Sequence, residues 1–185
     1  MMTKPLPDGA VPPPARAGRS QPVPARCRLA SADEMPEVSA LAVRSFHQCV
    51  APLYGAPGIA NFLAYASDEA LQSRCCQDQF VLVAENDEHE LLGMVEVRAH
   101  RHISMLFVEP DHRRQGVGRA LLAKAVALVR THNPALEALS VNASPNAVGA
   151  YRRFGFRATA AMQKTDGIIY RPMTLNLSDW VDPQS

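Results

Sequence analysis

A basic, glycine-containing turn lies between a strand pattern and a long helix pattern, and it narrows the folds that this chain can adopt. Residues 108 to 120 read VEPDHRRQGVGRA: the strand pattern ends at Pro110, and an amphipathic helix begins beside Gly116 and Gly118. The first turn of a helix leaves backbone N–H groups unpaired and carries partial positive charge, and glycines let a ligand approach the backbone closely. The turn therefore predicts either a phosphate or pyrophosphate site or simply a tight turn into the helix.

The same turn and the overall charge exclude several functional classes. Neither the Lys-Ser or Lys-Thr of a nucleoside triphosphatase nor the third glycine of a dinucleotide fingerprint follows Gly118. A balance of 19 Lys and Arg against 18 Asp and Glu gives no drive toward nucleic acid or anionic lipid. No apolar run approaches the roughly 20 residues that span a bilayer, and no apolar leader follows Lys4. We expect a soluble, cytoplasmic protein that binds neither nucleic acid nor membrane.

The N-terminal 25 residues differ in composition from the rest of the chain. They contain 7 of the 15 prolines and no aromatic residue. Such a segment cannot bury enough apolar surface to offset the entropy that ordering it would cost. We expect a disordered proline-rich tail over residues 1–25, one domain over residues 26–180, and a short C-terminal tail over residues 181–185.

Hydrophobic periodicity divides the domain into helices and strands. Helix patterns cover residues 35 to about 50, 59–66, 67–75, 117–131 and 146–154, with Asp33 as the N-cap of the first. Strand patterns cover residues 27–29, 80–84, 91–97, 102–108, 139–142, 156–162 and 168–175. The strands between 80 and 108 are close enough in sequence to form an antiparallel meander. The order predicts an α+β fold with one mixed sheet of about six to seven strands and about four to five helices.

Two motifs in this frame carry a resemblance to a known family. The run RRQGVG at residues 113–118 resembles the R/Q-x-x-G-x-G/A pyrophosphate loop of the GNAT superfamily of N-acetyltransferases. The run NAVGAYRRFGF at residues 146–156 resembles the second signature of that family, N-x-x-x-x-Y-x-x-x-G-F. The resemblance extends from about Arg26 to Leu177 and implies a GNAT fold whose sheet splays open at a parallel pair of strands. It also implies direct transfer of an acetyl group from acetyl-CoA to a primary amine of a small molecule or peptide, and a possible homodimer.

The resemblance further implies how acetyl-CoA is held. The backbone of Phe107 and Val108 would pair with the pantetheine arm as an additional strand, and Asn146 would lie near the pantetheine or the thioester. Backbone N–H groups from Arg114 to Ala120 would hold the pyrophosphate. The residues of this loop are Arg113, Arg114, Gln115, Gly116, Val117, Gly118, Arg119 and Ala120.

Acetyl transfer to an amine needs an acid for the departing thiolate and a base for the amine. Tyr151 matches the tyrosine of the second signature and is the expected acid, the alternative being a core aromatic whose hydroxyl is satisfied elsewhere. Many family members place a glutamate on the strand before the glycine loop, but the matching position here is His102. It is the expected base if it shares a strand face with Ser104 and Leu106 and is not merely an exposed histidine. Glu96 on the neighbouring strand is the second candidate.

The sequence also bears on metal binding, on the acceptor pocket and on a competing function. His100 and His102 form an H-x-H pair without a third ligand nearby, so we expect no metal site. His47, Gln48 and Tyr54 follow the first helix, in a region that commonly shapes the acceptor pocket of this family. The competing function is a catalytically inactive acyl-CoA-binding sensor or interaction module, and the presence of Tyr151 argues against it.

Overall fold

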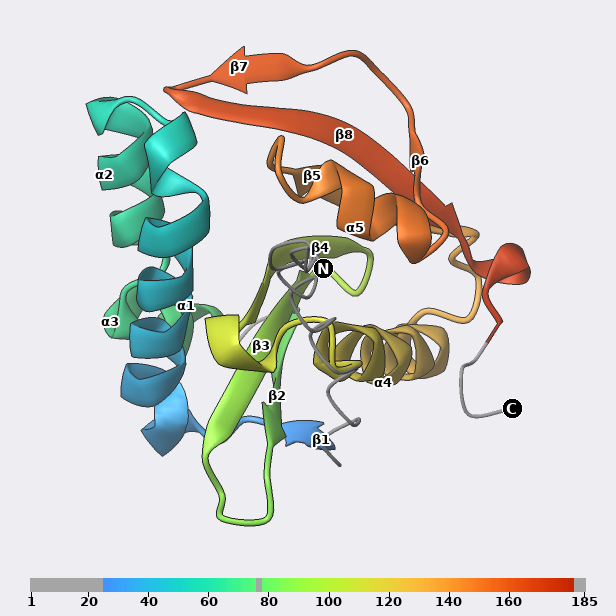
Figure 1. The fold of residues 1–185 in the computed structure, drawn as a ribbon. Helices are drawn as coiled ribbons and strands as arrows, with labels where there is room; N and C mark the ends of the chain where they lie inside the picture. The colour runs from blue at the N-terminus through green and yellow to red at the C-terminus, as the bar shows by residue number, and fades with distance from the viewer. Residues whose placement is uncertain (1–24, 76–77, 182–185) are drawn as a thin grey trace, which may run out of the picture.

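The computed structural model describes residues 25–75 and 78–181 (Figure 1). Almost all of the two predicted tails lies outside these residues. The helices are α1 (Met35–Cys49), α2 (Ala56–Tyr65), α3 (Asp68–Cys75), α4 (Val117–His132) and α5 (Val148–Arg153). The strands are β1 (Arg26–Leu29), β2 (Gln79–Glu85), β3 (Leu91–Arg98), β4 (His102–Val108), β5 (Ala138–Ala143), β6 (Arg157–Ala158), β7 (Gln163–Thr165) and β8 (Ile168–Asn176).

The strands form one open, mixed sheet in the order β1-β2-β3-β4-β5-β8-β6, with β7 paired to β8. The first four strands are an antiparallel meander, and β4 and β5 run parallel. The predicted α+β fold with one mixed sheet is therefore confirmed. The predicted strand over residues 156–162 is wrong, because only Arg157–Ala158 pairs with β8 there. The chain then forms a separate hairpin of β7 and β8 around Asp166 and Gly167, whose φ angles of 51° and 80° suit a tight turn.

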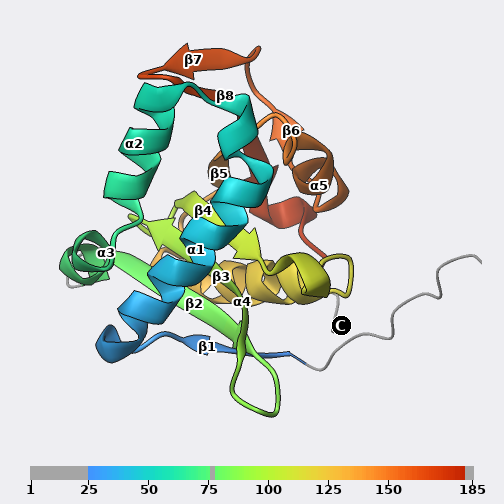
Figure 2. The same ribbon diagram turned by 60° about the vertical axis from the view of Figure 1, so that its left-hand side comes forward.

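Helix α4 covers one face of the sheet, and helices α1 and α3 cover the other (Figures 1 and 2). The predicted apolar faces of α4 and α1 point into these two layers, and each fully buried aliphatic side chain contributes roughly 1.5–3 kcal/mol. The α4 layer includes Leu121, Leu122, Ala125, Val95 and Val97. The α1 layer includes Met35, Val38, Leu41, Val83 and Met94.

The parallel pair at the centre of the sheet is very short. Strands β4 and β5 pair only at His102 with Ser140 and at Ile103 with Val141. Beyond these two pairs β5 turns to β8, and the remainder of β4 keeps a strand neighbour on its β3 side alone. This is the opening that the family resemblance implied, and it leaves backbone groups of β4 free to pair with a ligand.

A β-bulge changes the side-chain alternation of β4. Glu96 on β3 pairs with Met105 and Val97 pairs with Ile103, so Ser104 is an extra residue without a partner. Bulges re-aim side chains and are frequent beside active sites. The bulge interrupts the simple alternation expected for His102, Ser104 and Leu106, but all three residues line one cavity.

Two helices begin at residues other than those predicted. Ser31, rather than Asp33, starts the first helical turn, because the Oε2 atom of Glu34 accepts a hydrogen bond from the Ser31 backbone N–H at 2.8 Å. The short helix α5 begins at Val148 rather than at Asn146. Its C-terminal side is closed by Gly155 at a φ of 96°, as the sequence predicts.

Candidate active site

The turn before α4 has the geometry of an anion cradle. Gly116 adopts a φ of 93°, and a Cβ atom placed there would meet nothing within 4 Å. The N–H groups of Arg119 and Ala120 both bond to the Gly116 carbonyl at 3.0 Å. Across residues 25–75 and 78–181, the N–H groups from Arg114 to Gly118 have no hydrogen-bond partner. The open donors therefore run from Arg114 to Gly118, a shorter run than the resemblance implied, and they fit a diphosphate.

The side chains of this loop divide into inward and outward groups. Arg113 points inward, where its Nε atom donates to the Val108 carbonyl at 3.0 Å and its Nη1 atom lies 2.6 Å from the Cys49 sulfur. Gln115 donates to the Asp111 carbonyl at 2.7 Å. Arg114 and Arg119 are exposed and form no ion pair with any described residue. Arg113 thus shapes the loop, and the two exposed guanidinium groups are the ones placed to neutralise a bound anion.

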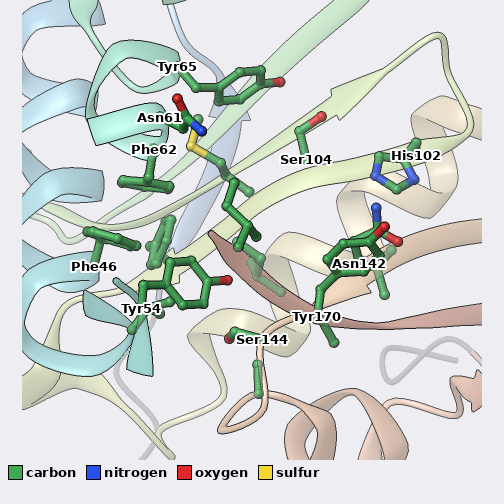
Figure 3. Close-up of a pocket in the computed structure, with 18 of the residues that line it drawn as sticks. Phe46, Tyr54, Asn61, Phe62, Tyr65, His102, Ser104, Asn142, Ser144 and Tyr170 are labelled. Carbon is green, nitrogen blue, oxygen red and sulfur yellow. The ribbon is translucent and has the colours of Figure 1, made fainter. Parts of the chain in front are cut away.

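A cavity of about 580 Å³ opens where β4 and β5 separate (Figure 3). Among the predicted residues, it brings together Tyr151, His102, Phe107 and Tyr54. Its wall is strongly aromatic and contains Phe46, Tyr54, Phe62, Tyr65, Phe107, Tyr151 and Tyr170. Its polar residues are Asn61, Arg98, His102, Ser104, Asn142, Ser144, Thr165 and Asp166. Concave sites of this size with an apolar wall and a few polar groups are the usual form of small-ligand sites.

Tyr151 lies on α5 and is only 6% exposed. Its ring meets the edge of the Phe156 ring, with centroids 5.1 Å apart. Burial raises the pKa of its hydroxyl, so the group keeps its proton at every physiological pH. Within the described part of the chain that hydroxyl has no hydrogen-bond partner. Tyr151 therefore offers the cavity a fixed, protonated hydroxyl.

His102 begins β4 and faces the same cavity. Its Nδ1 atom lies 2.9 Å from the Oγ atom of Ser140 on the neighbouring strand. Burial first, and then the positive charges of Arg98 and Arg101, lower its pKa to about 4. The ring is therefore neutral at pH 7 and can accept a proton.

Glu96 and Asn146 are held by other contacts. Glu96 is 1% exposed and does not line the cavity; its Oε1 atom bonds to the Nε atom of Arg74 at 2.8 Å. The Arg74 guanidinium stacks 3.8 Å from the centre of the Tyr65 ring, so Tyr65 stands beside this ion pair on the cavity wall. Asn146 donates to the Cys49 carbonyl at 2.8 Å and thereby ties the start of α5 to the end of α1.

The remaining candidates lie elsewhere or form no cluster. The His100 ring stacks on His132 at 4.7 Å, and the described residues contain no group of three side chains suited to a metal. His47 and Gln48 do not line the cavity. None of the described helices is both long and apolar enough to cross a membrane.

Sequence reasoning missed the residues of α2 that form one side of the cavity. Phe62 and Tyr65 are three residues apart, so they lie on one helix face, and this spacing was the available signal. Helix α2 and Tyr54, which lies just before it, are joined to the β7–β8 hairpin by three contacts. The Asn61 side chain donates to the Asp166 carbonyl at 3.0 Å, and the Tyr54 hydroxyl donates to the Ile169 carbonyl at 3.1 Å. Gly58 packs directly on Gly167.

Comparison with known proteins agrees with this geometry. The chain matches the family model of the GNAT acetyltransferase domain over residues 50–177. It is 31% identical over 104 residues to a peptidyl-lysine N-acetyltransferase, YjaB, of Salmonella typhimurium, a match that covers 56% of this chain and 68% of that relative. The YjaB protein of Escherichia coli is 31% identical over 84 residues, which cover 45% of this chain and 54% of that protein. The chain belongs to the GNAT acetyltransferases. It is an N-acetyltransferase, and acetyl-CoA is its acetyl donor.

Solved structures show the same fold. A GCN5-related N-acetyltransferase of Rhodopseudomonas palustris superposes with a TM-score of 0.67 at 22% identity, over 88% of this chain and 99% of that one. The PaiA N-acetyltransferase of Thermoplasma acidophilum, solved in complex with coenzyme A, superposes with a TM-score of 0.66 at 21% identity, over 82% and 98%.

Proposed function

We propose that this protein transfers the acetyl group of acetyl-CoA directly to a primary amine of a peptide or small molecule. The observation that carries the proposal is the placement of Tyr151 and His102 on one cavity beside the unpaired part of β4. A fixed acid and a neutral base around one reaction space are what direct transfer requires. The bound donor would supply the acetyl group as a thioester.

The open backbone of the chain supports the placement of the donor. The free N–H groups from Arg114 to Gly118 would bind the pyrophosphate, with Arg114 and Arg119 as its counter-charges. The unpaired side of β4 around Phe107 and Val108 would pair with the amide-containing arm as an added strand. Asn146 would act from a distance, by holding the start of α5 against Cys49.

Tyr151 and His102 divide the proton movements between them. As the new N–C bond forms and the C–S bond breaks, His102 accepts the proton of the amine, and the Tyr151 hydroxyl gives its proton to the departing sulfur. Glu96 is the second candidate base. Because it lies outside the cavity wall, it would have to act through another group.

The acceptor is proposed to be a primary amine, and the lysine side chain is one candidate. The similarity to the YjaB proteins, which are peptidyl-lysine N-acetyltransferases, supports this candidate. The test is release of coenzyme A from acetyl-CoA in the presence of a panel of amines, amino acids and lysine peptides. Steady turnover with any of them would support the enzyme. Acetyl-CoA binding without turnover across the panel would favour an inactive acyl-CoA-binding module instead.

A further inference from the structure

We propose that Tyr65 and Ser104 bind the nitrogen of the acceptor, and that this acceptor is a primary amine carried on an apolar stem. The inference rests on the proposed acetyl transfer and specifies its substrate class. It is carried by the hydroxyls of Tyr65 and Ser104, which line one wall of the cavity without a hydrogen bond of normal geometry to any described residue, and by the aromatic surface beside them (Figure 3).

Three buried oxygen atoms at and behind this part of the cavity wall lack a hydrogen bond of normal geometry among residues 25–75 and 78–181. They are the Tyr65 hydroxyl and the Ser104 hydroxyl, which line the cavity, and the Oε2 atom of Glu96, which lies outside its wall. The Tyr65 hydroxyl interacts electrostatically with both of the other groups. Buried polar atoms in folded proteins are nearly always paired, because an unpaired one loses its contacts with water and gains nothing. Tyr65 and Ser104 both line the cavity, so a ligand there can supply the missing contacts.

The chemistry of these atoms selects an N–H donor. Arg74 forms an ion pair with the Oε1 atom of Glu96, and the Oε2 atom remains available as an acceptor. Burial, and next the nearby Glu96 carboxylate, raise the pKa of the Tyr65 hydroxyl, so the phenol stays neutral. With its hydrogen directed toward that carboxylate, the phenol keeps its lone pairs for an incoming N–H group. The Ser104 hydroxyl offers a second acceptor. The wall is therefore suited to a primary amine, which has several N–H bonds to donate.

The surface beside these oxygens is suited to an apolar stem. Phe46 and Phe62 are stacked, with ring centroids 3.8 Å apart and planes at 10°. Phe107 meets the Phe62 ring edge-on at 5.7 Å, and Tyr54 meets Phe46 at 5.8 Å. Aromatic faces bind alkyl and aryl groups by burying their surface. An amine whose body carries many hydroxyl groups would leave those groups unpaired against this wall.

The position of Ser104 fits the proposed reaction. It is the bulged residue of β4 and stands two residues beyond His102, at the point where the strand loses its β5 neighbour. An amine bound to Ser104 therefore lies on the same strand as the proposed base. The Arg74 guanidinium, stacked on the Tyr65 ring, fixes the other acceptor in place.

The experiment compares amines and variants under steady-state conditions. With acetyl-CoA held at saturation, kcat/KM is measured for n-hexylamine, a blocked lysine derivative and glucosamine. We expect at least about a tenfold preference for the two amines with apolar stems. Tyr65→Phe keeps the ring beneath Arg74 and removes only the hydroxyl. We expect it to lower kcat/KM for n-hexylamine by roughly 10- to 100-fold, chiefly through a higher amine KM, with the calorimetric Kd for acetyl-CoA unchanged.

Ser104→Ala should also lower kcat/KM for n-hexylamine. The matched control is Ser45→Ala, because the Ser45 hydroxyl is equally buried and without a partner in the described residues but does not line the cavity. Ser45→Ala should leave kcat/KM for n-hexylamine and the Kd for acetyl-CoA unchanged. A preference for glucosamine, or near-wild-type amine kinetics in both Tyr65→Phe and Ser104→Ala, would overturn the acceptor inference alone. Failure of the wild-type protein to acetylate any amine would overturn the proposed function as well.

Discussion

The Nδ1 atom of His102 lies 2.9 Å from the Oγ atom of Ser140, across the short parallel pair of β4 and β5. Ser140 Oγ also donates to the Arg101 carbonyl at 3.2 Å. A hydroxyl has one hydrogen, so Ser140 accepts from His102, and the proton of the neutral ring resides on Nδ1. The lone pair of the imidazole is therefore on Nε2, and Ser140 is a positioning residue for the proposed base.

The first prediction concerns this tautomer. In wild-type protein the ¹⁵N chemical shifts of His102 should report a protonated Nδ1 at pH 7. Ser140→Ala should increase the Nε2-protonated form and lower kcat by roughly tenfold, which is less than the about 10²- to 10⁴-fold contribution of a general base because His102 itself remains. Ser140→Thr keeps the hydroxyl, so it should keep the Nδ1-protonated form of His102 and a kcat close to that of the wild-type protein. An Nε2-protonated ring in wild-type protein would contradict the assignment.

The second prediction follows from the low pKa of His102. An unfolded histidine titrates near 6.5, whereas His102 in the folded protein titrates at about 4. The unfolded state therefore binds more protons between these values, and the stability contributed by His102 is lost as pH falls from 6.5 to 4. Tm should decline over this interval in wild-type protein and decline less in His102→Gln. The acidic limb of kcat/KM should likewise lie near pH 4.

A separate acidic transition should follow at lower pH. Hydrogen bonding to Arg28 lowers the pKa of Glu34 to about 2, against a usual value of 4.5. The stability contributed by this carboxylate is present above pH 4.5 and is lost as pH falls from 4.5 to 2. Glu34→Gln should remove part of this second decline and leave the decline between pH 6.5 and 4 intact, which distinguishes the two groups.

The third prediction tests the acid. Tyr151→Phe keeps the ring against Phe156 and removes the hydroxyl. If that hydroxyl protonates the departing sulfur, kcat should fall by on the order of 10²-fold with little change in the acetyl-CoA KM. Steady-state kinetics over both substrates measure the two constants. An unchanged kcat would show that another group protonates the sulfur.

The fourth prediction concerns the contact between α2 and the β7–β8 hairpin. A Cβ atom on Gly58 would lie 2.3 Å from the Gly167 carbonyl oxygen, which is backbone and cannot move aside cheaply. Gly58→Ala should therefore destabilise the protein by roughly 1–3 kcal/mol in chemical denaturation. Gly149→Ala is the matched control, because its Cβ would meet only the flexible end of Arg153 at 3.7 Å. It should be neutral or slightly stabilising in its helix.

The fifth prediction concerns the buried ion pair beside the cavity. Arg74→Met would leave the Glu96 carboxylate, 1% exposed, without its cation, and should cost about 3–5 kcal/mol of stability. The double variant Arg74→Met with Glu96→Leu should regain most of this loss, because no charge remains buried. Equal destabilisation by the single and double variants would mean that packing, rather than charge, sets the cost.

The sequence predicts the fold well because its signals are local or strongly patterned. Apolar spacing predicted α1 and α4, and apolar runs joined by short turns predicted the meander. The Asp166-Gly167 pair predicted the turn of the final hairpin, but the strand before it was expected over residues 156–162 and lies at Gln163–Thr165. The two family motifs identified the loop before α4 and the position of Tyr151. Each of these signals lies within a few consecutive residues, which is why a single sequence suffices to read them.

The parts of the site that depend on tertiary pairing could not be predicted in this way. The bulge at Ser104 is one extra residue relative to β3, and it is visible only when two strands are aligned. The ion pair of Glu96 joins it to Arg74, 22 residues away, and no local pattern indicates it. The hydrogen bond from Asn146 reaches the carbonyl of Cys49, 97 residues away. In each case the partner is distant in sequence.

The two residue pairs that join β4 to β5 also bear on the lifetime of the protein in a cell. Among the described residues, strands β1–β4 are paired with the remaining strands only through His102 and Ile103 of β4 and their partners on β5. A donor arm bound along β4 as an added strand would therefore reinforce the weakest part of the sheet. A ligand present at 100 times its Kd stabilises the folded state by about 2.7 kcal/mol through mass action. Proteolytic turnover follows the unfolded population. The amount of this protein would then rise and fall with the supply of its own donor, independently of transcription.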